Sequence, residues 1–369
     1  MKLLILSYKD CDWNNTPSKA IYEYANGTDT EVFFGYCSST NTPIKDKIFT
    51  GVKKCIPSFN DVINKNSGYK KSSDYSKIIP HNLSDNKKLI RFVESNGIQA
   101  VICGDVFSMK KMTHIKNVYK TIIPSYGIIS SYSVIPFLNQ TNLDAYFVPN
   151  EDVRHELLSY GIPPENIYIT GIPVSEELDC GLTREEARNY LFIQKVKQVY
   201  LIVGTGLRER FLINLLNEFY TKALKNSAVY ILCDRDSGIR EKIVRIFGLN
   251  SIIKPVIFSR STGIYMKASD VILTKPGGLS VTGAGLSGTP IVMLPSSDNQ
   301  DIGNAKFFTS KGMSFFAHDE KEAVSYANQI LSDRTLYGKI MSNLKFNLIS
   351  DSAKKILTVI KGKIIKKNI

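Results

Sequence analysis

The sequence lacks any long apolar run. No stretch approaches the roughly 18 to 20 uninterrupted apolar residues that a membrane-spanning helix needs. Residues 1–7 pass directly into polar sequence, which favours a first strand over a signal peptide. Hydrophobic residues make up 43% of the chain, a share typical of a globular protein. We therefore expect a cytoplasmic protein without a membrane span.

Residues that bind metals are few and scattered. The six cysteines contain no Cys-x-x-Cys pair, and the four histidines are equally dispersed. Neither a zinc site nor a disulfide framework is indicated by such spacing. We expect reduced cysteines, no metal site and no cofactor.

Acidic residues are outnumbered, because 34 Asp and Glu stand against 47 Lys and Arg, giving a formal charge of +13. Lysines gather with aromatic residues in segment 45–77 and with isoleucines in segment 354–367. Both segments are typical of elements that meet an anionic membrane surface. A solvated loop with a basic terminal helix is the alternative. No helix-turn-helix, zinc-finger or aromatic RNA-binding pattern accompanies the charge, so nucleic acid is not an expected partner.

Apolar segments alternate with helix-like ones along the whole chain, which predicts parallel sheets covered by helices. A chain of 369 residues is too long for one ordinary core. We therefore expect an α/β protein with two Rossmann-like domains. The expected strands are residues 2–6, 31–35, 100–103, 120–124 and 145–148 in the first half, and 198–203, 228–233, 252–258, 271–273 and 291–294 in the second.

A glycine-rich turn stands between a buried strand and a small-residue helix. Residues 273–282 read Leu-Thr-Lys-Pro-Gly-Gly-Leu-Ser-Val-Thr. Gly277 and Gly278 let the backbone approach a ligand, Ser280 and Thr282 offer hydroxyls, and a helix N-terminus presents N–H groups. The pattern predicts a cradle for a nucleotide diphosphate. The alternative is a turn whose glycines only let the helix pack tightly on the sheet.

Around this turn the chain resembles the nucleotide-sugar glycosyltransferases of family 28, closest to the diacylglycerol glucosyltransferases and monogalactosyldiacylglycerol synthases. The resemblance is carried by the turn, by Gln300 and the pair Asn304-Ala305, and by residues 144–150 and 158–174. It implies the GT-B fold, in which two Rossmann-like domains face a central cleft and the last helix crosses back to the N-terminal domain. The expected parts are an acceptor-binding domain at 1–171, a nucleotide-sugar-binding domain at 172–350 and a C-terminal helix at 351–369.

The resemblance places the donor, expected to be UDP-linked, on the second domain. A second small-residue turn, Gly204-Thr205-Gly206, follows a strand and is a candidate to face the diphosphate, with Arg208 or Arg210 supplying charge. Lys275 is the most attractive residue for stabilising the leaving diphosphate without an obligatory metal. A lysine that points from its loop into solvent is the alternative for Lys275.

Further donor contacts come from the resemblance alone. It implies that the backbone at Phe258 and Ser259 meets the uracil ring, and that Gln300 and Asn304 reach sugar hydroxyls. Helix capping around residues 297–298 is the alternative for the last two. The full set of predicted donor-binding residues is Gly204, Thr205, Gly206, Arg208, Phe258, Ser259, Lys275, Pro276, Gly277, Gly278, Leu279, Ser280, Val281, Thr282, Gln300 and Asn304.

The predicted catalytic positions depart from the family pattern. Asn14 stands where the family has the His that deprotonates the acceptor, and an amide cannot act as a base. Asp10, Asp12 and Asp105 are the candidate replacements. Asp10 and Asp12 have a turn-forming role as their alternative.

Two further departures concern recognition. Gly283 stands where the family has a Glu that binds the donor's ribose hydroxyls, and each lost bond of that kind costs about 1.5 to 3 kcal/mol. Segments 104–107 and 124–127 replace acceptor-side segments that contain His and Asp in the family. Departures at these positions, beside surviving scaffold motifs, indicate a changed task more than decay.

Three functions fit these observations. The first is an inverting glycosyltransferase that moves a sugar from a nucleotide-sugar donor to the hydroxyl of a lipid or a specialised metabolite, in the cytoplasm or peripherally on the inner face of the cell membrane. The second is a GT-B scaffold that transfers a different nucleotide- or phosphate-linked group. The third is a non-catalytic binding protein with the same fold.

Overall fold

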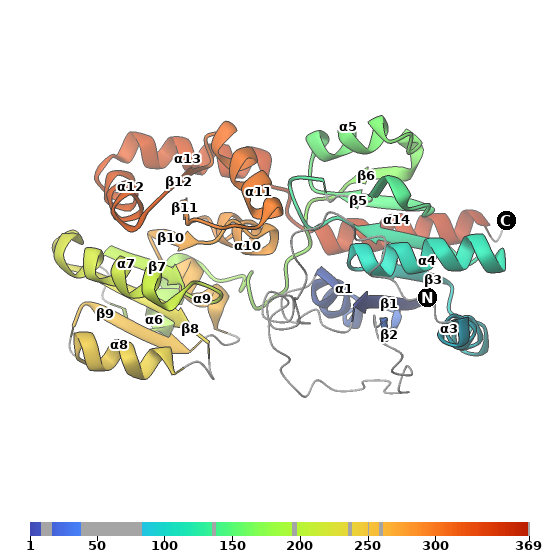
Figure 1. The fold of residues 1–369 in the computed structure, drawn as a ribbon, viewed down its shortest axis with the longest axis horizontal. Helices are drawn as coiled ribbons and strands as arrows, with labels where there is room; N and C mark the ends of the chain where they lie inside the picture. The colour runs from blue at the N-terminus through green and yellow to red at the C-terminus, as the bar shows by residue number, and fades with distance from the viewer. Residues whose placement is uncertain are drawn as a thin grey trace. The chain divides into compact units, whose positions relative to one another are not determined.

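The computed structural model describes residues 1–8, 17–37, 83–134, 138–193, 198–234, 238–249, 251–257 and 261–367. The chain divides into two compact units, each built on its own sheet (Figure 1). The first domain comprises Met1–Ser130, Val134–Pro173 and Asp351–Ile369. The second comprises Ser131–Ser133 and Val174–Ser350. The sequence placed the two main boundaries at 171/172 and 350/351.

The first domain contains a six-stranded parallel sheet in the order β2-β1-β3-β4-β5-β6. Its inner strands are short and largely buried on both faces, as parallel strands covered by helices require, whereas the two edge strands are only partly buried. The bounds are β1 Lys2–Tyr8, β2 Glu31–Cys37, β3 Ala100–Cys103, β4 Ser125–Ile128, β5 Ala145–Val148 and β6 Ile167–Ile169. The helices are α1 Pro17–Asn26, α3 Leu83–Ser95, α4 Val106–Tyr119, α5 Glu151–Ser159 and α14 Ser352–Lys367, with short 3-10 turns at Leu138–Gln140 and Pro164–Asn166.

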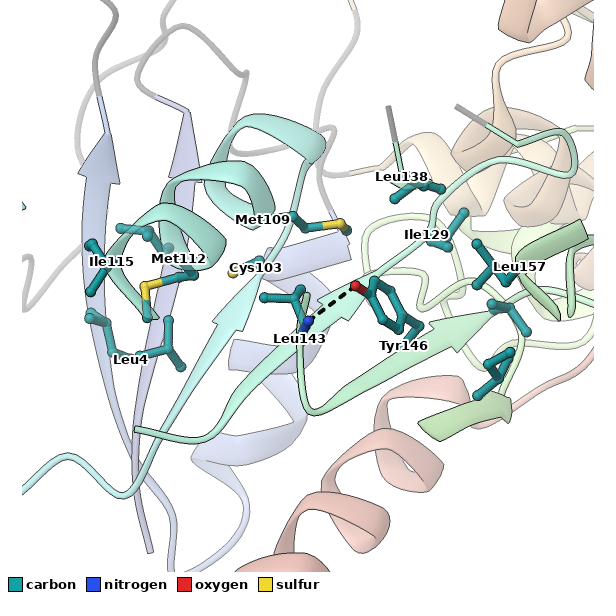
Figure 2. Packing of buried hydrophobic residues seen from close by; sticks show 14 of the residues in the cluster. Leu4, Cys103, Met109, Met112, Ile115, Ile129, Leu138, Leu143, Tyr146 and Leu157 are labelled. Carbon is teal, nitrogen blue, oxygen red and sulfur yellow. Dashed lines mark hydrogen bonds between the residues drawn. The ribbon is translucent and has the colours of Figure 1, made fainter. Parts of the chain in front are cut away.

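Two apolar cores lie on the two faces of this sheet. On one face, Met109, Met112 and Ile115 of α4 share a buried cluster with Leu4 of β1, and Met112 and Ile115 lie beside Leu4 (Figure 2). In the same core the phenol of Tyr146 accepts the N–H of Leu143 at 3.1 Å, so a buried polar group is satisfied within the apolar layer. On the other face, α1 and α14 bring Ile21, Ile356 and Ile360 onto β1, β3 and β5. The C-terminal helix is therefore part of the core of the first domain.

One predicted strand is wrong. Residues 120–124 form no strand, because Lys120 ends α4 in the left-handed conformation (φ 51°) and Pro124 has no N–H to give to a sheet. Strand β4 begins directly after this proline, whose carbonyl still accepts Val101 N at 2.8 Å. Strands β6 and β12 were not among the predicted strands, and each is only three residues long.

The second domain contains another six-stranded parallel sheet, in the order β12-β11-β10-β7-β8-β9. Counted from β7, the strands lie in the order 3-2-1-4-5-6, and the direction of winding reverses between β7 and β10. Together the two sheets confirm the prediction of two Rossmann-like domains. The strands are β7 Gln198–Val203, β8 Ser227–Cys233, β9 Ile253–Ile257, β10 Val271–Thr274, β11 Ile291–Met293 and β12 Ser314–Phe316. The helices are α6 Arg184–Tyr190, α7 Glu209–Lys222, α8 Ile239–Phe247, α9 Thr262–Ala268, α10 Gly278–Leu286, α11 Asn299–Ser310, α12 Glu320–Ser332 and α13 Arg334–Asn347.

An ion cluster ties α6 to this sheet. Asp270, just before β10, accepts from Arg188 at 2.6 Å and from the backbone N–H of Val199 at 2.8 Å. Arg184 reaches the other carboxylate oxygen at 3.4 Å and the carbonyl of Gly288 at 3.0 Å. The Arg188 and Asp270 side chains are only 11% and 19% exposed, so water screens this ion pair poorly. The ion pair holds α6, the first helix of the domain, against the sheet.

Candidate functional site

The two predicted turns of the second domain meet at the point where its strand order reverses. Strands β7 and β10 are direct neighbours, and the loops after them leave from the same edge of the sheet. Lys275 Nζ donates to the carbonyl of Gly206 at 3.0 Å and so joins the two loops. In open parallel sheets this reversal point is where ligands bind. The topology therefore brings both turns to one place, and their contact with a donor stays a prediction.

Glycine is required in the loop after β7 for two different reasons. Gly206 has φ +70°, a left-handed conformation that other residues rarely adopt. A side chain at Gly204 would lie 2.8 Å from the carbonyl of Leu232 on the next strand. Two other predicted residues of this loop are accessible to different degrees. Thr205 is half-buried, and Arg208, the residue before α7, is exposed.

The loop after β10 delivers a helix N-terminus. We call residues 275–278 the glycine turn. Gly277 has extended backbone angles (φ −65°, ψ 133°), and α10 begins at Gly278. The first helical bond is from Val281 N to Gly277 O, so the N–H groups of Gly278, Leu279 and Ser280 precede the intrahelical ladder. Such groups, with the partial positive charge of the helix end, suit a phosphate.

Thr282 has partners inside the domain. Its side chain is 1% exposed, donates to Gly278 O at 2.6 Å and lies 2.8 Å from the phenol oxygen of Tyr132. The structure thus gives this hydroxyl an internal role, and direct contact of Thr282 with a donor stays a prediction. Ser280, two residues earlier, is half-buried.

Asn304 is also a buried side chain, 1% exposed. Its amide donates to Pro276 O at 2.8 Å, and its carbonyl oxygen accepts from Tyr132 N at 2.7 Å and Ser131 Oγ at 2.9 Å. Through these three hydrogen bonds, the Asn304 amide connects the glycine turn to Ser131 and Tyr132. Gln300, one turn earlier on α11, is half-buried. Sugar contacts by both side chains stay predictions.

Asp301 faces the glycine turn and was missed by the sequence analysis. A carbon placed on Gly277 would lie 3.8 Å from Asp301 Oδ1, and Ser296 Oγ donates to Asp301 Oδ2 at 2.6 Å. Burial raises the pKa of Asp301, against the lowering effects of the Ser296 hydrogen bond and of Lys275. The only signal in the sequence was its position directly after Gln300.

Gly283 lies on a packed face of α10. A Cβ there would lie 3.2 Å from Leu178 Cβ and 3.6 Å from Val174 Cγ1. The space for a family-type glutamate is therefore filled by the segment that opens the second domain. Phe258 and Ser259 lie outside the described residues.

The candidate bases concern the first domain. Its strand order reverses between β1 and β3, which makes the carboxyl ends of these strands the corresponding place for a ligand. Asp105 follows β3 and caps α4, accepting Ser108 N at 2.9 Å, so it has a structural role whatever its chemistry. Asp10, Asp12 and Asn14 follow β1 in the sequence but lie outside the described residues.

The predicted membrane-surface elements have different outcomes. Segment 45–77 lies outside the described residues. Helix α14 places Ile356, Ile360 and Ile364 in the core of the first domain, while Ile365 is half-exposed. Its exposed lysines are Lys354, Lys355 and Lys361. No helix among the described residues has the length and apolar character needed to cross a membrane. In the same part of the chain, no three His, Cys, Asp or Glu side chains are grouped for a metal.

Comparison with known proteins finds one family model and several curated relatives that are similar to this chain. A family model described as monogalactosyldiacylglycerol (MGDG) synthase matches residues 15–174. The processive diacylglycerol beta-glucosyltransferase of Bacillus licheniformis is 22% identical over 275 residues, covering 74% of this chain and 71% of the relative.

Solved structures agree on the architecture. The chain is similar to Acinetobacter baumannii MurG, with a TM-score of 0.64 and 14% identity over 98% of this chain and 99% of that one. It is equally similar to UDP-GlcNAc 2-epimerase from Neisseria meningitidis bound to UDP-GlcNAc, with a TM-score of 0.64 and 15% identity over 98% and 100% of the two chains. Such likenesses show the fold alone, which is GT-B. The family match over residues 15–174 and the 22% identical glucosyltransferase relative agree with the resemblance to glycosyltransferase family 28.

Proposed function

We propose that the chain is an inverting glycosyltransferase that moves a sugar from a UDP-linked donor to a hydroxyl group of a lipid. The observation that carries the proposal is the meeting of the two turns at the reversal point of the second sheet, joined by the 3.0 Å bond from Lys275 to Gly206. Relatives named for diacylglycerol glucosylation and MGDG synthesis support a lipid acceptor, and a solved neighbour that holds UDP-GlcNAc supports a UDP-linked donor.

The chemistry follows from these parts. The acceptor oxygen forms a bond to the anomeric carbon on the face opposite UDP, the bond from that carbon to the diphosphate oxygen breaks, and the configuration inverts. Negative charge develops on the departing diphosphate. In this proposal Lys275 and the N–H groups that open α10 stabilise this charge. The acceptor proton passes to a carboxylate.

Three residues are candidates for that carboxylate, namely Asp105, Asp10 and Asp12. Of these, only Asp105 lies among the residues that the structure describes. Asp105→Asn separates the two roles of this residue, because asparagine caps a helix as well as aspartate but cannot take the proton. If Asp105 is the base, kcat falls by about 100- to 10,000-fold while the melting temperature stays near that of the parent. If kcat is retained, Asp10→Asn and Asp12→Asn are the variants to measure next.

One observation favours a second candidate, a GT-B protein that transfers a different nucleotide-linked group. The space beside Gly283, where the resemblance implies a ribose-binding glutamate, is filled by Leu178. A donor that does not depend on this contact would be accepted as readily as a UDP-sugar.

We also propose peripheral contact with an anionic membrane through the exposed lysines of α14 and not through its apolar face, which the core uses. Flotation with vesicles that contain or lack anionic lipid tests this contact separately from catalysis.

Calorimetric titration with UDP, UDP-glucose, UDP-galactose and UDP-GlcNAc tests the proposed function. Micromolar binding of one sugar nucleotide, followed by its transfer to diacylglycerol in mixed micelles detected by mass spectrometry, is the expected result. Binding without transfer would favour the second candidate. No binding across the panel would overturn the proposal.

A further inference from the structure

A three-residue segment of the chain between β4 and β5 packs in the second domain beside the glycine turn. Ser131–Ser133 belongs to this domain by its contacts, and its central residue, Tyr132, is 5% exposed. The Tyr132 ring stacks on Phe307 of α11, with 4.9 Å between ring centroids and 7° between planes, and meets Phe308 edge-on at 5.1 Å. Tyr132 is therefore part of the interior and not of a surface loop.

The phenol of Tyr132 reaches the glycine turn through Thr282. A threonine hydroxyl has one hydrogen, and Thr282 directs it to Gly278 O at 2.6 Å. In the 2.8 Å bond between the two hydroxyls the phenol is therefore the donor. Burial raises the pKa of Tyr132, so the phenol keeps this hydrogen at neutral pH.

The backbone of Tyr132 reaches the same turn through Asn304. Its N–H donates to Asn304 Oδ1 at 2.7 Å, and Asn304 Nδ2 donates to Pro276 O at 2.8 Å. In a trans peptide the carbonyl and the following N–H point in opposite directions. The bond from Asn304 holds the Pro276 carbonyl toward α11, so the N–H of Gly277 points away from α11. The route through Asn304 therefore fixes Pro276, and the route through Thr282 fixes Gly278.

The sequence of α11 is adapted to this contact. A Cβ on Gly303 would overlap the side chain of Ser133, so only glycine lets the segment come this close to the helix. This observation is independent of the hydrogen bonds and indicates that residues 131–133 pack against α11 in one defined position.

We propose that Tyr132 is a positioning residue of the donor site, which holds the glycine turn in the conformation that binds a diphosphate. The inference rests on the proposed function for the identity of the ligand. Its structural part, that Tyr132 orders the turn, holds for the protein without ligand.

The test compares Tyr132→Phe with Tyr200→Phe. Phenylalanine keeps the stacked ring of Tyr132 and removes only its hydroxyl. Tyr200 is the matched control, since it is a fully buried tyrosine of the same domain whose phenol donates to Asn328 Oδ1 at 2.6 Å, on α12. Tyr132→Phe is expected to raise the Kd for UDP about 3- to 10-fold, the effect of one lost hydrogen bond, and Tyr200→Phe to leave it unchanged.

A second pair of variants tests the route through Thr282. Thr282→Ser keeps the hydroxyl and is expected to keep the affinity of the parent, whereas Thr282→Val removes the hydroxyl and weakens binding. Because the phenol acts through this hydroxyl, adding Tyr132→Phe to Thr282→Val causes little further loss. Additive losses would contradict this route.

Amide hydrogen exchange of the ligand-free protein keeps the inference separate from the proposed function. The amides of residues 277–283 are expected to exchange faster in Tyr132→Phe and not in Tyr200→Phe. If exchange in this segment is the same in both variants, the inference is overturned even when UDP binds. If the parent binds no nucleotide but the segment loosens only in Tyr132→Phe, the positioning role stands and the proposed ligand is wrong.

Discussion

Replacement of Lys275 by methionine tests the donor site most directly. Methionine keeps an unbranched apolar stem and removes the charge, together with the 3.0 Å bond to Gly206 O. A hydrogen bond to a charged group contributes about 1.5 to 3 kcal/mol. Loss of one such bond to a bound diphosphate corresponds to a Kd for UDP about 10- to 100-fold higher. Stability should change little, because Lys275 is half-exposed and water can replace it at the Gly206 carbonyl.

The assay is calorimetric titration of parent and variant with UDP and, separately, with uridine. Uridine lacks the diphosphate, so its affinity should be the same in both proteins. The difference for UDP should shrink as salt is added, because a half-exposed charge is partly screened. Lys339→Met, at an exposed lysine of α13, is the matched control and should bind UDP like the parent.

Two results would refute this reasoning. A Kd for UDP within twofold of the parent would show that Lys275 makes no contact with the diphosphate. An equal loss of affinity for UDP and uridine would show that the substitution disturbs the site as a whole and that the charge is not the cause.

Three further predictions follow from the same domain. Gly283→Glu should lower UDP affinity and stability because Leu178 fills the space, at a cost of about 1 to 3 kcal/mol, whereas the double variant with Leu178→Ala should bind better than either single variant in calorimetry. Asp270→Ala leaves Arg188 buried without its carboxylate, which should cost about 3 kcal/mol and lower the melting temperature by about 6 to 12 °C in calorimetric scans. Burial raises the pKa of Asp301, so the native form holds this proton more tightly than the unfolded chain, and the contribution to stability present at low pH is lost as pH rises through that pKa. Asp301→Asn should remove this dependence of the free energy of unfolding on pH, measured by urea unfolding at several pH values. An unchanged dependence would show that another group causes it.

The fold was largely predictable because of how parallel sheets are buried. Strands covered on both faces are continuous apolar runs, and such runs at 100–103 and 198–203 became β3 and β7 without change. The prediction failed where one residue overrides the pattern. Residues 120–124 look like a strand by composition, but the sheet begins only after Pro124.

The site divides in the same way between local and distant information. Glycines and a lysine between a strand and a helix are visible in ten residues of sequence, and the structure places the predicted turn at the reversal point of the sheet. The partners of Thr282 and Asn304 were not visible, because Tyr132 lies 150 and 172 positions away from them. Hydrogen-bonding side chains beside a glycine turn can face a ligand or the interior, and only tertiary packing decides between the two.

Gly283, where the resemblance implies a glutamate, is closely packed against a neighbouring segment of the same domain. A side chain deleted from a packed helix leaves a cavity, which destabilises the protein unless neighbours fill it. Here the segment from Val174 to Leu178 fills it, and the same segment contacts Gly263 of α9, which donates to Glu177 O at 2.7 Å and would meet that carbonyl at 2.8 Å if it carried a side chain. Two glycines on two helices thus accommodate one turn of chain. Restoring a glutamate therefore requires opening this segment as well, which is why the double variant with Leu178→Ala, and not Gly283→Glu alone, is expected to recover affinity for UDP.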